Sequence, residues 1–157
     1  MRIYKYISLF FILITLASCS KEPPILQQKT VFDNAAWNRF EYLEYSPMII
    51  DNSTPYIFTL RVECTEDYPY NFLKIQLDKT SKDGEEYVKV FSIPVKDQNG
   101  VFLEEAQDGI YHVTAILTRQ MYFSSPGKYQ INIEELMPPY YLKGVKSAEF
   151  IIEKRIE

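Results

Sequence analysis

Hydrophobic and polar residues alternate through most of the chain after residue 30, and this period of two predicts β-strands. In segment 56–64 (YIFTLRVEC) apolar residues occupy every second position, and Thr59, Arg61 and Glu63 lie between them. Such alternation places one set of side chains against a core and the other toward solvent. The same pattern predicts further strands in segments 72–78, 87–93, 110–118, 129–134 and 148–153, and weaker ones within 39–45 and 101–103.

Short turns rich in glycine separate the predicted strands. They lie at residues 82–84, 98–100, 107–109, 125–127 and 143–144. Seven or eight short strands joined in this way predict an all-β domain, an antiparallel, immunoglobulin-like β-sandwich. The pattern allows one helical turn, at residues 134–137, which Pro138 and Pro139 would end.

The N-terminus has a different pattern, which predicts a cleavable export signal. Arg2 and Lys5 precede an almost wholly apolar segment, residues 7–16. Ten helical residues extend about 15 Å, only half of a bilayer core of roughly 30 Å, so this segment is too short for a permanent membrane span. Its length suits a signal peptide, and small residues follow it. We therefore expect residues 1–18 to form the signal.

Residues 16–19 (LASC) resemble the lipobox of bacterial lipoproteins. In that class the signal is cut before the cysteine, which carries a diacylglyceryl group on its thiol. The resemblance implies that lipid on Cys19 attaches the mature protein to a membrane, and an ordinary secretory signal with a chance cysteine is the alternative. Residues 19–30 are mostly polar and predict a spacer after the lipid. Residues 31–157 would then form the sandwich domain.

Removal of residues 1–18 makes the chain more acidic. The remaining 139 residues contain 15 Lys and Arg against 21 Asp and Glu, a net charge of −6, with the two signs interspersed. Binding to nucleic acid depends on clustered Lys and Arg, so this composition argues against a nucleic-acid partner. A single domain is expected at this length.

No set of residues suited to catalysis, to a cofactor or to a metal is visible in the sequence. His112, the single histidine, lies inside a predicted strand without other ligands at suitable spacing. Adjacent acidic residues point to opposite faces of a strand and do not form a carboxylate pair by themselves. Segment 97–100 has too few spaced oxygen donors for calcium and fits a turn. Cys64, without a partner if Cys19 carries lipid, is expected to be buried.

Aromatic residues are the more informative feature. The 139 residues after the signal contain 11 Tyr, 8 Phe and 1 Trp, and many fit the alternation of the strands. Others fall in predicted loops, where aromatic side chains often recognise proteins or sugars. Capping of the open ends of the sandwich is the alternative role. These candidate surface residues are Trp37, Tyr68, Pro69, Tyr70, Tyr122, Phe123, Tyr140 and Tyr141.

In order and spacing, several segments are similar to the gliding-motility lipoprotein GldH family of Bacteroidetes. The chain departs from that family's pattern after Met137, where Pro138-Pro139-Tyr140-Tyr141 replaces a polar, often basic stretch. The similar segments lie within 31–154 and are 34–37 (NAAW), 67–73 (DYPYNFL), Phe123 with 126–129 (PGKY), 131–134 (INIE) with Met137, and 142–145 (LKGV).

This resemblance implies a non-catalytic envelope lipoprotein, an accessory or assembly subunit associated with the gliding-motility and type IX secretion machinery. The partners that it implies are the membrane and other envelope proteins, and it implies no cofactor. A ligand- or glycan-binding surface lipoprotein that uses loop aromatics is the alternative function, and an enzyme is a third. The resemblance does not imply that the organism glides.

The residues after Cys19 bear on the choice of membrane. Ser20 follows the cysteine, whereas the inner-membrane retention signal of enteric bacteria has an aspartate there. Lys21 and Glu22 come next, whereas surface-exported lipoproteins of Bacteroidetes often carry an acidic cluster. These features predict the periplasmic leaflet of the outer membrane, with the inner membrane and the cell surface as alternatives.

Overall fold

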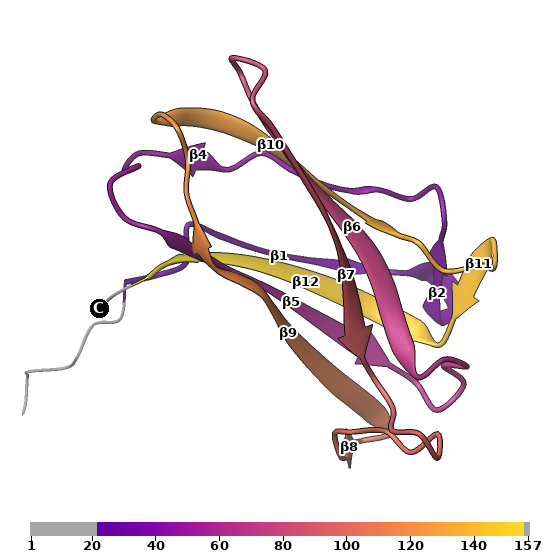
Figure 1. The fold of residues 1–157 in the computed structure, drawn as a ribbon. Coiled ribbons are helices and arrows are strands. Elements are labelled where there is room, and N and C mark those ends of the chain that lie inside the picture. The colour runs from indigo at the N-terminus through magenta and orange to yellow at the C-terminus, as the bar shows by residue number, and fades with distance from the viewer. Residues whose placement is uncertain (1–21, 156–157) are drawn as a thin grey trace, which may run out of the picture.

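The computed structural model describes residues 22–155, which form two antiparallel β-sheets packed face to face (Figure 1). The first sheet has the strand order β1-β12-β5-β9-β8, and the second has the order β3-β10-β6-β7, with β4 paired to the beginning of β10. A separate ribbon consists of β2 and β11. The strands are β1 (Leu26–Val31), β2 (Ala36–Asn38), β3 (Leu43–Tyr45), β4 (Met48–Ile49), β5 (Tyr56–Cys64), β6 (Phe72–Ser81), β7 (Glu86–Pro94), β8 (Ala106–Gln107), β9 (Ile110–Met121), β10 (Gly127–Glu135), β11 (Tyr141–Lys143) and β12 (Val145–Lys154), and a 3-10 turn, η2 (Asp33–Ala35), precedes β2.

The core lies between the two sheets and is built by the alternating apolar residues. Leu60 of β5 and Ile75 of β6 are fully buried, as the period of two requires. Phe150 of β12 meets Phe58 edge to face, with ring centroids 5.3 Å apart, and Tyr45 of the opposite sheet at 4.9 Å. Such aromatic pairs add to the free energy of burial. The predicted antiparallel β-sandwich is therefore confirmed.

Residues 22–155 form twelve strands where the alternation predicted seven or eight, because several strands are very short. Five of them, β2, β3, β4, β8 and β11, contain two or three residues each, too few to show a period. The alternation also does not reveal β1, since four of its six residues (LQQKTV) are polar. This strand lies at the edge of its sheet, where most of its side chains face solvent.

Three expectations are wrong. The spacer does not extend to residue 30, because β1 pairs with β12 from Leu26 onward. Residues 134–137 do not form a helical turn, since the buried positions continue with a period of two through Glu135 to Met137. Segment 101–103 forms no strand and contributes only a single bridge to Lys96. The predicted signal peptide and Cys19 lie outside the described residues.

The two ends of the sandwich differ in content (Figure 1). We call the end at which both described termini lie the terminal end; it comprises Glu22, segments 50–55 and 122–126, and Arg155. The opposite, distal end comprises segments 33–42, 65–71 and 136–144. Strand β1 runs from the first end to the second, since its first residue pairs with Ile152 and its last with Ser147.

A lysine is buried in the core near the terminal end. Nζ of Lys79, whose residue is 2% exposed, donates to the carbonyl of Tyr122 (3.1 Å) and to Glu85 Oε1 (3.4 Å). The same atom lies 5.1 Å from the ring centroid of Phe123 and 5.5 Å from that of Tyr129. A buried ammonium group is costly unless it is paired, so these contacts hold the loop before β10 against the core.

Glu135 places a second charged group in the core, toward the distal end. The residue is 1% exposed; its Oε2 accepts the N–H of Met137 (2.7 Å), whereas Oε1 has no hydrogen-bond partner among residues 22–155. Burial raises the pKa of this carboxyl above its ordinary value, because the apolar surroundings favour the neutral form. The folded chain therefore keeps this proton to a higher pH than the unfolded chain does.

We expect the wild-type protein to lose stability as pH rises, because Glu135 becomes charged in the core, and we expect the substitution Glu135→Gln to remove this loss. Below the ordinary pKa of glutamate both the folded and the unfolded chain hold the proton, and the full stability is present. Above it the unfolded chain releases the proton first, so the free energy of unfolding falls until the folded-state pKa is passed. Glutamine retains an acceptor for Met137 without the charge.

Thermal unfolding at pH 4 and pH 7 measures this effect. The difference in Tm between Glu135→Gln and the wild type should be larger and more positive at pH 7. Glu134→Gln is the control, because this neighbour faces outward on the same strand. A Tm difference for Glu135→Gln that does not change with pH would contradict the prediction.

Candidate functional site

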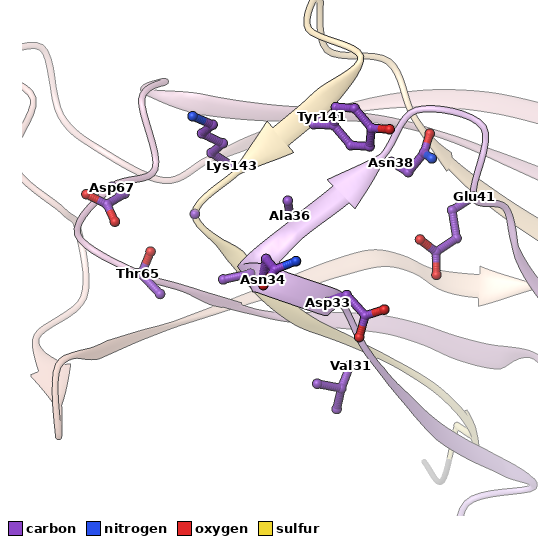
Figure 2. A pocket seen from close by; sticks show the side chains of 12 residues that line it. Val31, Asp33, Asn34, Ala36, Asn38, Glu41, Thr65, Asp67, Tyr141 and Lys143 are labelled. Atoms are coloured by element: carbon purple, nitrogen blue, oxygen red, sulfur yellow. The ribbon is translucent and has the colours of Figure 1, made fainter.

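Three segments far apart in the sequence meet at the distal end (Figure 2). Strands β2 and β11 pair so that Trp37 lies opposite Leu142. Gly144, directly after β11, donates its N–H to the carbonyl of Ala35 (2.8 Å) and accepts the N–H of Thr65 (2.9 Å). These bonds join the segments before β2, after β5 and after β11 into one backbone network.

Gly144 occupies a position where no side chain fits. Its φ is +81°, and a Cβ atom there would lie 2.4 Å from the backbone nitrogen of Tyr68 and 2.5 Å from its Cα. Because the neighbouring atoms belong to the backbone, they cannot move aside as a flexible side chain could. The absence of a side chain is what allows the turn between β11 and β12 to pack against the loop after β5.

The turn before β2 has an unusual backbone. Asn34 and Ala35 have φ values of 55° and 48°, in the left-handed region. Asparagine tolerates this region, but alanine there costs about 1–2 kcal/mol. Trp37 anchors the turn: it is fully buried, stacks on Phe32 with ring centroids 4.9 Å apart, and donates Nε1–H to the carbonyl of Glu41 (2.9 Å). The strained turn thereby places Asn34 along the wall of a groove.

This groove has a volume of about 950 Å³. In Figure 2, Lys143 and Asp67 lie on one side of it, and Asp33 and Glu41 lie on the other. All four side chains are exposed to solvent. The groove is therefore open and polar, with more acidic than basic groups along its walls.

Exposed aromatic rings lie beside the groove. Phe40, Tyr140 and Tyr141 are 61%, 51% and 58% exposed. The ring of Tyr140 lies 5.4 Å from that of Phe40 and 4.7 Å from that of Tyr141, both in edge-to-face arrangements. Tyr141 also lines the groove. We call Phe40, Tyr140 and Tyr141 the distal aromatic cluster.

The structure separates the eight residues that the sequence marked as a candidate surface. Trp37, Tyr68 and Phe123 are 0%, 1% and 3% exposed, which corrects their placement in a surface: they cap the ends of the core instead. Tyr70 is half-buried and packs against Tyr68 at 6.2 Å, whereas Pro69 is exposed. Tyr122 is exposed at the terminal end, whereas Tyr140 and Tyr141 are exposed at the distal end. Binding by the exposed members stays a prediction.

Sequence reasoning did not identify Phe40 as a surface residue, because it lies within a segment predicted as a weak strand. The strand begins later, at Leu43, and Phe40 belongs to a turn in which its N–H binds the side chain of Asn38 (3.1 Å). The Asn-Arg-Phe-Glu sequence of this turn contains an Asx-type residue at its start, and this was the available signal.

The other residues considered for chemistry have structural surroundings. His112 lies on the outer face of the first sheet, with Nδ1 4.0 Å from Oε1 of Glu63, which also pairs with Lys29 (2.6 Å). Cys64 is buried, as expected, and burial raises the pKa of its thiol to about 12. Asp97 accepts the N–H groups of two later residues and closes the predicted turn. Within residues 22–155, no group of three or more His, Cys, Asp and Glu side chains is arranged to hold a metal ion.

Fold and site together define a small β-sandwich domain with an open polar groove and exposed aromatic rings at one end. The chain belongs to the GldH lipoprotein family, whose model matches residues 24–151. It is therefore a lipoprotein of the gliding-motility type, associated with the cell envelope and anchored to a membrane through lipid. Among the described residues no helix is long and apolar enough to cross a membrane.

Other comparisons add little. No curated protein matches the chain. Among solved structures, the chain is similar to the crystal structure of the enzymatically active domain of bacteriophage CBA120 tailspike protein 4, with 13% sequence identity and a TM-score of 0.27. The similarity covers 83% of this chain and 19% of the tailspike chain. A TM-score this low has no bearing on fold or function here.

The contact at Gly144 generates a stability prediction. Gly144→Ala should destabilise the domain by several kcal/mol for two reasons. The added methyl group would clash with backbone atoms of Tyr68, and alanine is strained at a positive φ. Gly100→Ala is a matched control: its φ is +79°, but nothing lies within 4 Å of the added Cβ atom, so only about 1–2 kcal/mol should be lost. Urea unfolding measures both, and equal losses would contradict the proposed contact.

Proposed function

We propose that this protein is a non-catalytic accessory or assembly subunit of the gliding-motility and type IX secretion machinery. It is attached by lipid on Cys19, and it binds another envelope protein through its distal end. The observation that carries this proposal is the position of the distal aromatic cluster beside the polar groove, at the end opposite the described N-terminus. The periplasmic leaflet of the outer membrane is the location we propose.

The composition of the distal end suits recognition of a protein. Exposed aromatic side chains supply large, rigid contact area, and they are enriched where binding energy concentrates in interfaces. Tyrosine also offers a hydroxyl group that can bond to a polar partner. The groove adds three carboxylates, of Asp33, Glu41 and Asp67, which would attract a basic segment of the partner.

Shared and chain-specific features lie side by side at this end. Six of the twelve residues that line the groove, including Asn34 and Gly144, lie in the segments that carry the family resemblance. The other six, which include Asp33 and Glu41, lie outside those segments. The aromatic rings of Tyr140 and Tyr141 lie where the chain departs from the family pattern. A groove that is shared in part, with a chain-specific rim, supports a common type of partner recognised through chain-specific contacts.

The surroundings of the acidic groups support a non-catalytic role. Catalytic acids and bases are commonly buried or placed against a charged neighbour that shifts their pKa. Asp33, Glu41 and Asp67 are instead exposed on separate loops. The buried carboxyl of Glu135 is enclosed in the core and does not line the groove.

A glycan-binding lipoprotein is the second candidate, favoured by the exposed tyrosine rings beside carboxylate and amide side chains. Sugars stack on aromatic rings and bond to such polar groups. Trp37 cannot report this binding by direct stacking, because it is fully buried. A glycan array with the purified protein separates the two candidates: saturable binding that depends on Tyr140 and Tyr141 would favour the glycan.

The protein-partner proposal predicts the effect of removing the distal rings. The triple substitution Phe40→Ser, Tyr140→Ser and Tyr141→Ser should reduce crosslinking to the partner at least tenfold in membranes, a change of about 1.4 kcal/mol or more. The reason is that exposed rings supply contact area in the complex and little stability to the monomer. In-cell crosslinking followed by pull-down measures the loss.

A double substitution on strand β7 is the matched control. Val88 and Val90 are 58% and 44% exposed on the outer face of the second sheet, away from the distal cluster. Their replacement by serine should leave the crosslinked product unchanged. Recovery of monomer alone from wild-type membranes, with secretion and motility intact in a deletion strain, would count against the proposal.

The lipid attachment predicts a separate outcome. In cells that express Cys19→Ala, labelled palmitate should be absent from the protein and the uncleaved precursor should accumulate, because cleavage in this class follows lipid addition to the cysteine. Fractionation and gel mobility measure both. A Cys19→Ala protein that matures and still carries label would refute attachment at Cys19.

A further inference from the structure

We infer that the terminal end of the sandwich rests on the bilayer, with segments 50–55 and 122–126 in contact with lipid. The partner of this surface is the membrane that anchors the protein. The inference rests on the proposed lipid on Cys19 and adds a second, non-covalent contact to it.

The short tether is the first argument. Three residue steps separate Cys19 from Glu22, the first described residue, so the extended chain spans at most about 11 Å between them. The pKa of Lys154 is raised mainly by its hydrogen bond to Asp51, and the charge of Glu22 adds to this effect, so Glu22 lies near Lys154 at the terminal end. The N–H of Ile25 already bonds to the carbonyl of Ile152 (2.9 Å). This end of the domain must therefore remain close to the lipid headgroups.

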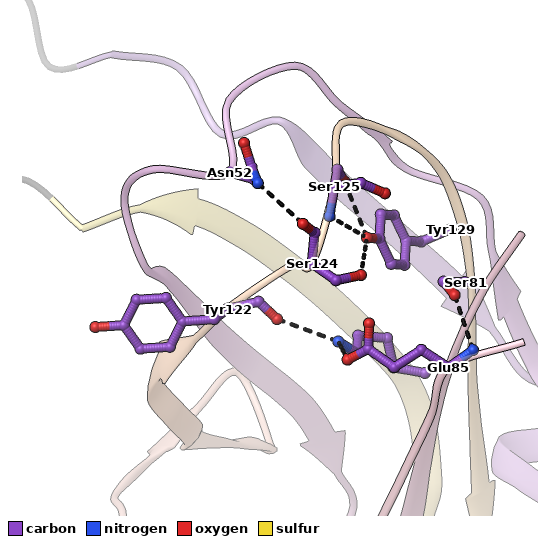
Figure 3. A network of polar contacts seen from close by, with 8 residues as sticks. Asn52, Ser81, Glu85, Tyr122, Ser124, Ser125 and Tyr129 are labelled. Carbon is purple, nitrogen blue, oxygen red and sulfur yellow. Dashed lines mark hydrogen bonds and ion pairs between the residues drawn. The ribbon is translucent and has the colours of Figure 1, made fainter. Parts of the chain in front are cut away.

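Two exposed hydrophobic side chains project from this end. Ile50, 84% exposed, is the most exposed large hydrophobic residue in the described part of the chain, and Tyr122 is 56% exposed. The side chain of Asn52 donates to the carbonyl of Ser124 (3.1 Å), which ties the two loops together (Figure 3). An aliphatic group gains free energy by leaving water, and tyrosine is enriched at the membrane–water interface.

The loop that carries Ile50 is held in place before any lipid contact. Asp51 Oδ1 accepts the N–H of Ser53 (2.8 Å) and its hydroxyl (2.6 Å), and Oδ2 pairs with Lys154 (3.1 Å). In Figure 3 the Tyr122 ring points away from the network around Glu85. Insertion of these side chains would therefore require little further ordering of the loops.

Basic side chains at the same end suit phospholipid headgroups. Arg119 and Arg155 line one depression together with Ile57. Neither arginine forms an ion pair within residues 22–155, and the N–H of Arg155 bonds to the carbonyl of Pro55 (2.9 Å) beside the first loop. A guanidinium group binds phosphate oxygens well, so the exposed Ile50 and Tyr122 suit the boundary of the acyl chains, and the two arginines suit the headgroups beside it.

A matched pair of labels tests this orientation. Tyr122→Cys and Tyr141→Cys replace tyrosines that are 56% and 58% exposed at opposite ends of the domain. Each full-length, lipidated protein is labelled with an environment-sensitive maleimide and reconstituted in vesicles of phosphatidylethanolamine and phosphatidylglycerol. Labelling is selective, because Cys64 is fully buried and an acylated Cys19 has no free thiol.

Nitroxide-bearing lipid should quench the label at position 122 several-fold more than the label at position 141, and aqueous iodide should show the reverse order. Adding Ile50→Ser, Arg119→Gln and Arg155→Gln to the Tyr122→Cys protein should reduce quenching by lipid while the protein still sediments with vesicles. Equal quenching at the two positions, with either quencher, would overturn the inference.

Mass spectrometry of the N-terminal peptide distinguishes the two ways of failing. An acylated Cys19 together with equal quenching would reject only the lipid contact of the terminal end. A mature protein without acyl groups would reject the proposed anchor, and the orientation would fall with it. Unchanged thermal unfolding of the labelled variants checks that the substitutions leave the fold intact.

Discussion

The rest of the structure depends on the pairing of the last strand, β12, in the interior of the first sheet. It lies between β1 and β5, and its inward residues Phe150 and Ile152 are fully buried. All six residues of β1 pair with β12, so the first strand of the described chain is fixed beside the last one. The same strand begins directly after Gly144, whose contact with the loop after β5 holds the ribbon of β2 and β11. Strand β12 therefore fixes the position of β1 at the terminal end and of the β2–β11 ribbon at the distal end.

The sequence predicts the long strands because their signal is local. Strands β5, β6 and β10 contact the core on one face, so burial and alternation coincide. Strand β12 is buried at three successive positions, 150–152, and its alternation of apolar and charged residues shows only in part of its length. Strand β1 has no such signal, since its stability comes from backbone pairing and from contacts such as Gln27 with Glu149, 122 residues away. The short ribbon likewise depends on distant partners. No pattern within a few residues encodes these pairings.

The candidate surface was predictable only in part, for a similar reason. Buried and exposed aromatic residues in loops cannot be told apart by residue type, because they differ only in whether the folded chain covers them. Trp37 and Tyr68 each donate to a backbone carbonyl four residues later, Glu41 and Phe72, which satisfies their polar atoms inside the core. Tyr140 follows two prolines on a bend, Tyr141 begins β11, and both side chains are exposed to solvent. The prediction of loop aromatics therefore marked exposed rings at both ends of the domain together with three residues, Trp37, Tyr68 and Phe123, that are buried in its core.

The length of the strands sets the height at which the distal end works. Ten residues in β12 extend about 33 Å. With the lipid that we propose on Cys19, a tether of at most about 11 Å would place the groove roughly 35–45 Å from the site of attachment. A partner would thus meet the distal aromatic cluster in the aqueous compartment, beyond the headgroups. A short tether and a membrane-bound terminal end would also restrict tilting, so the groove would be presented at a nearly constant height and orientation. Such restriction raises the effective concentration of the groove for a partner fixed in the same envelope layer, which a long flexible spacer would not do.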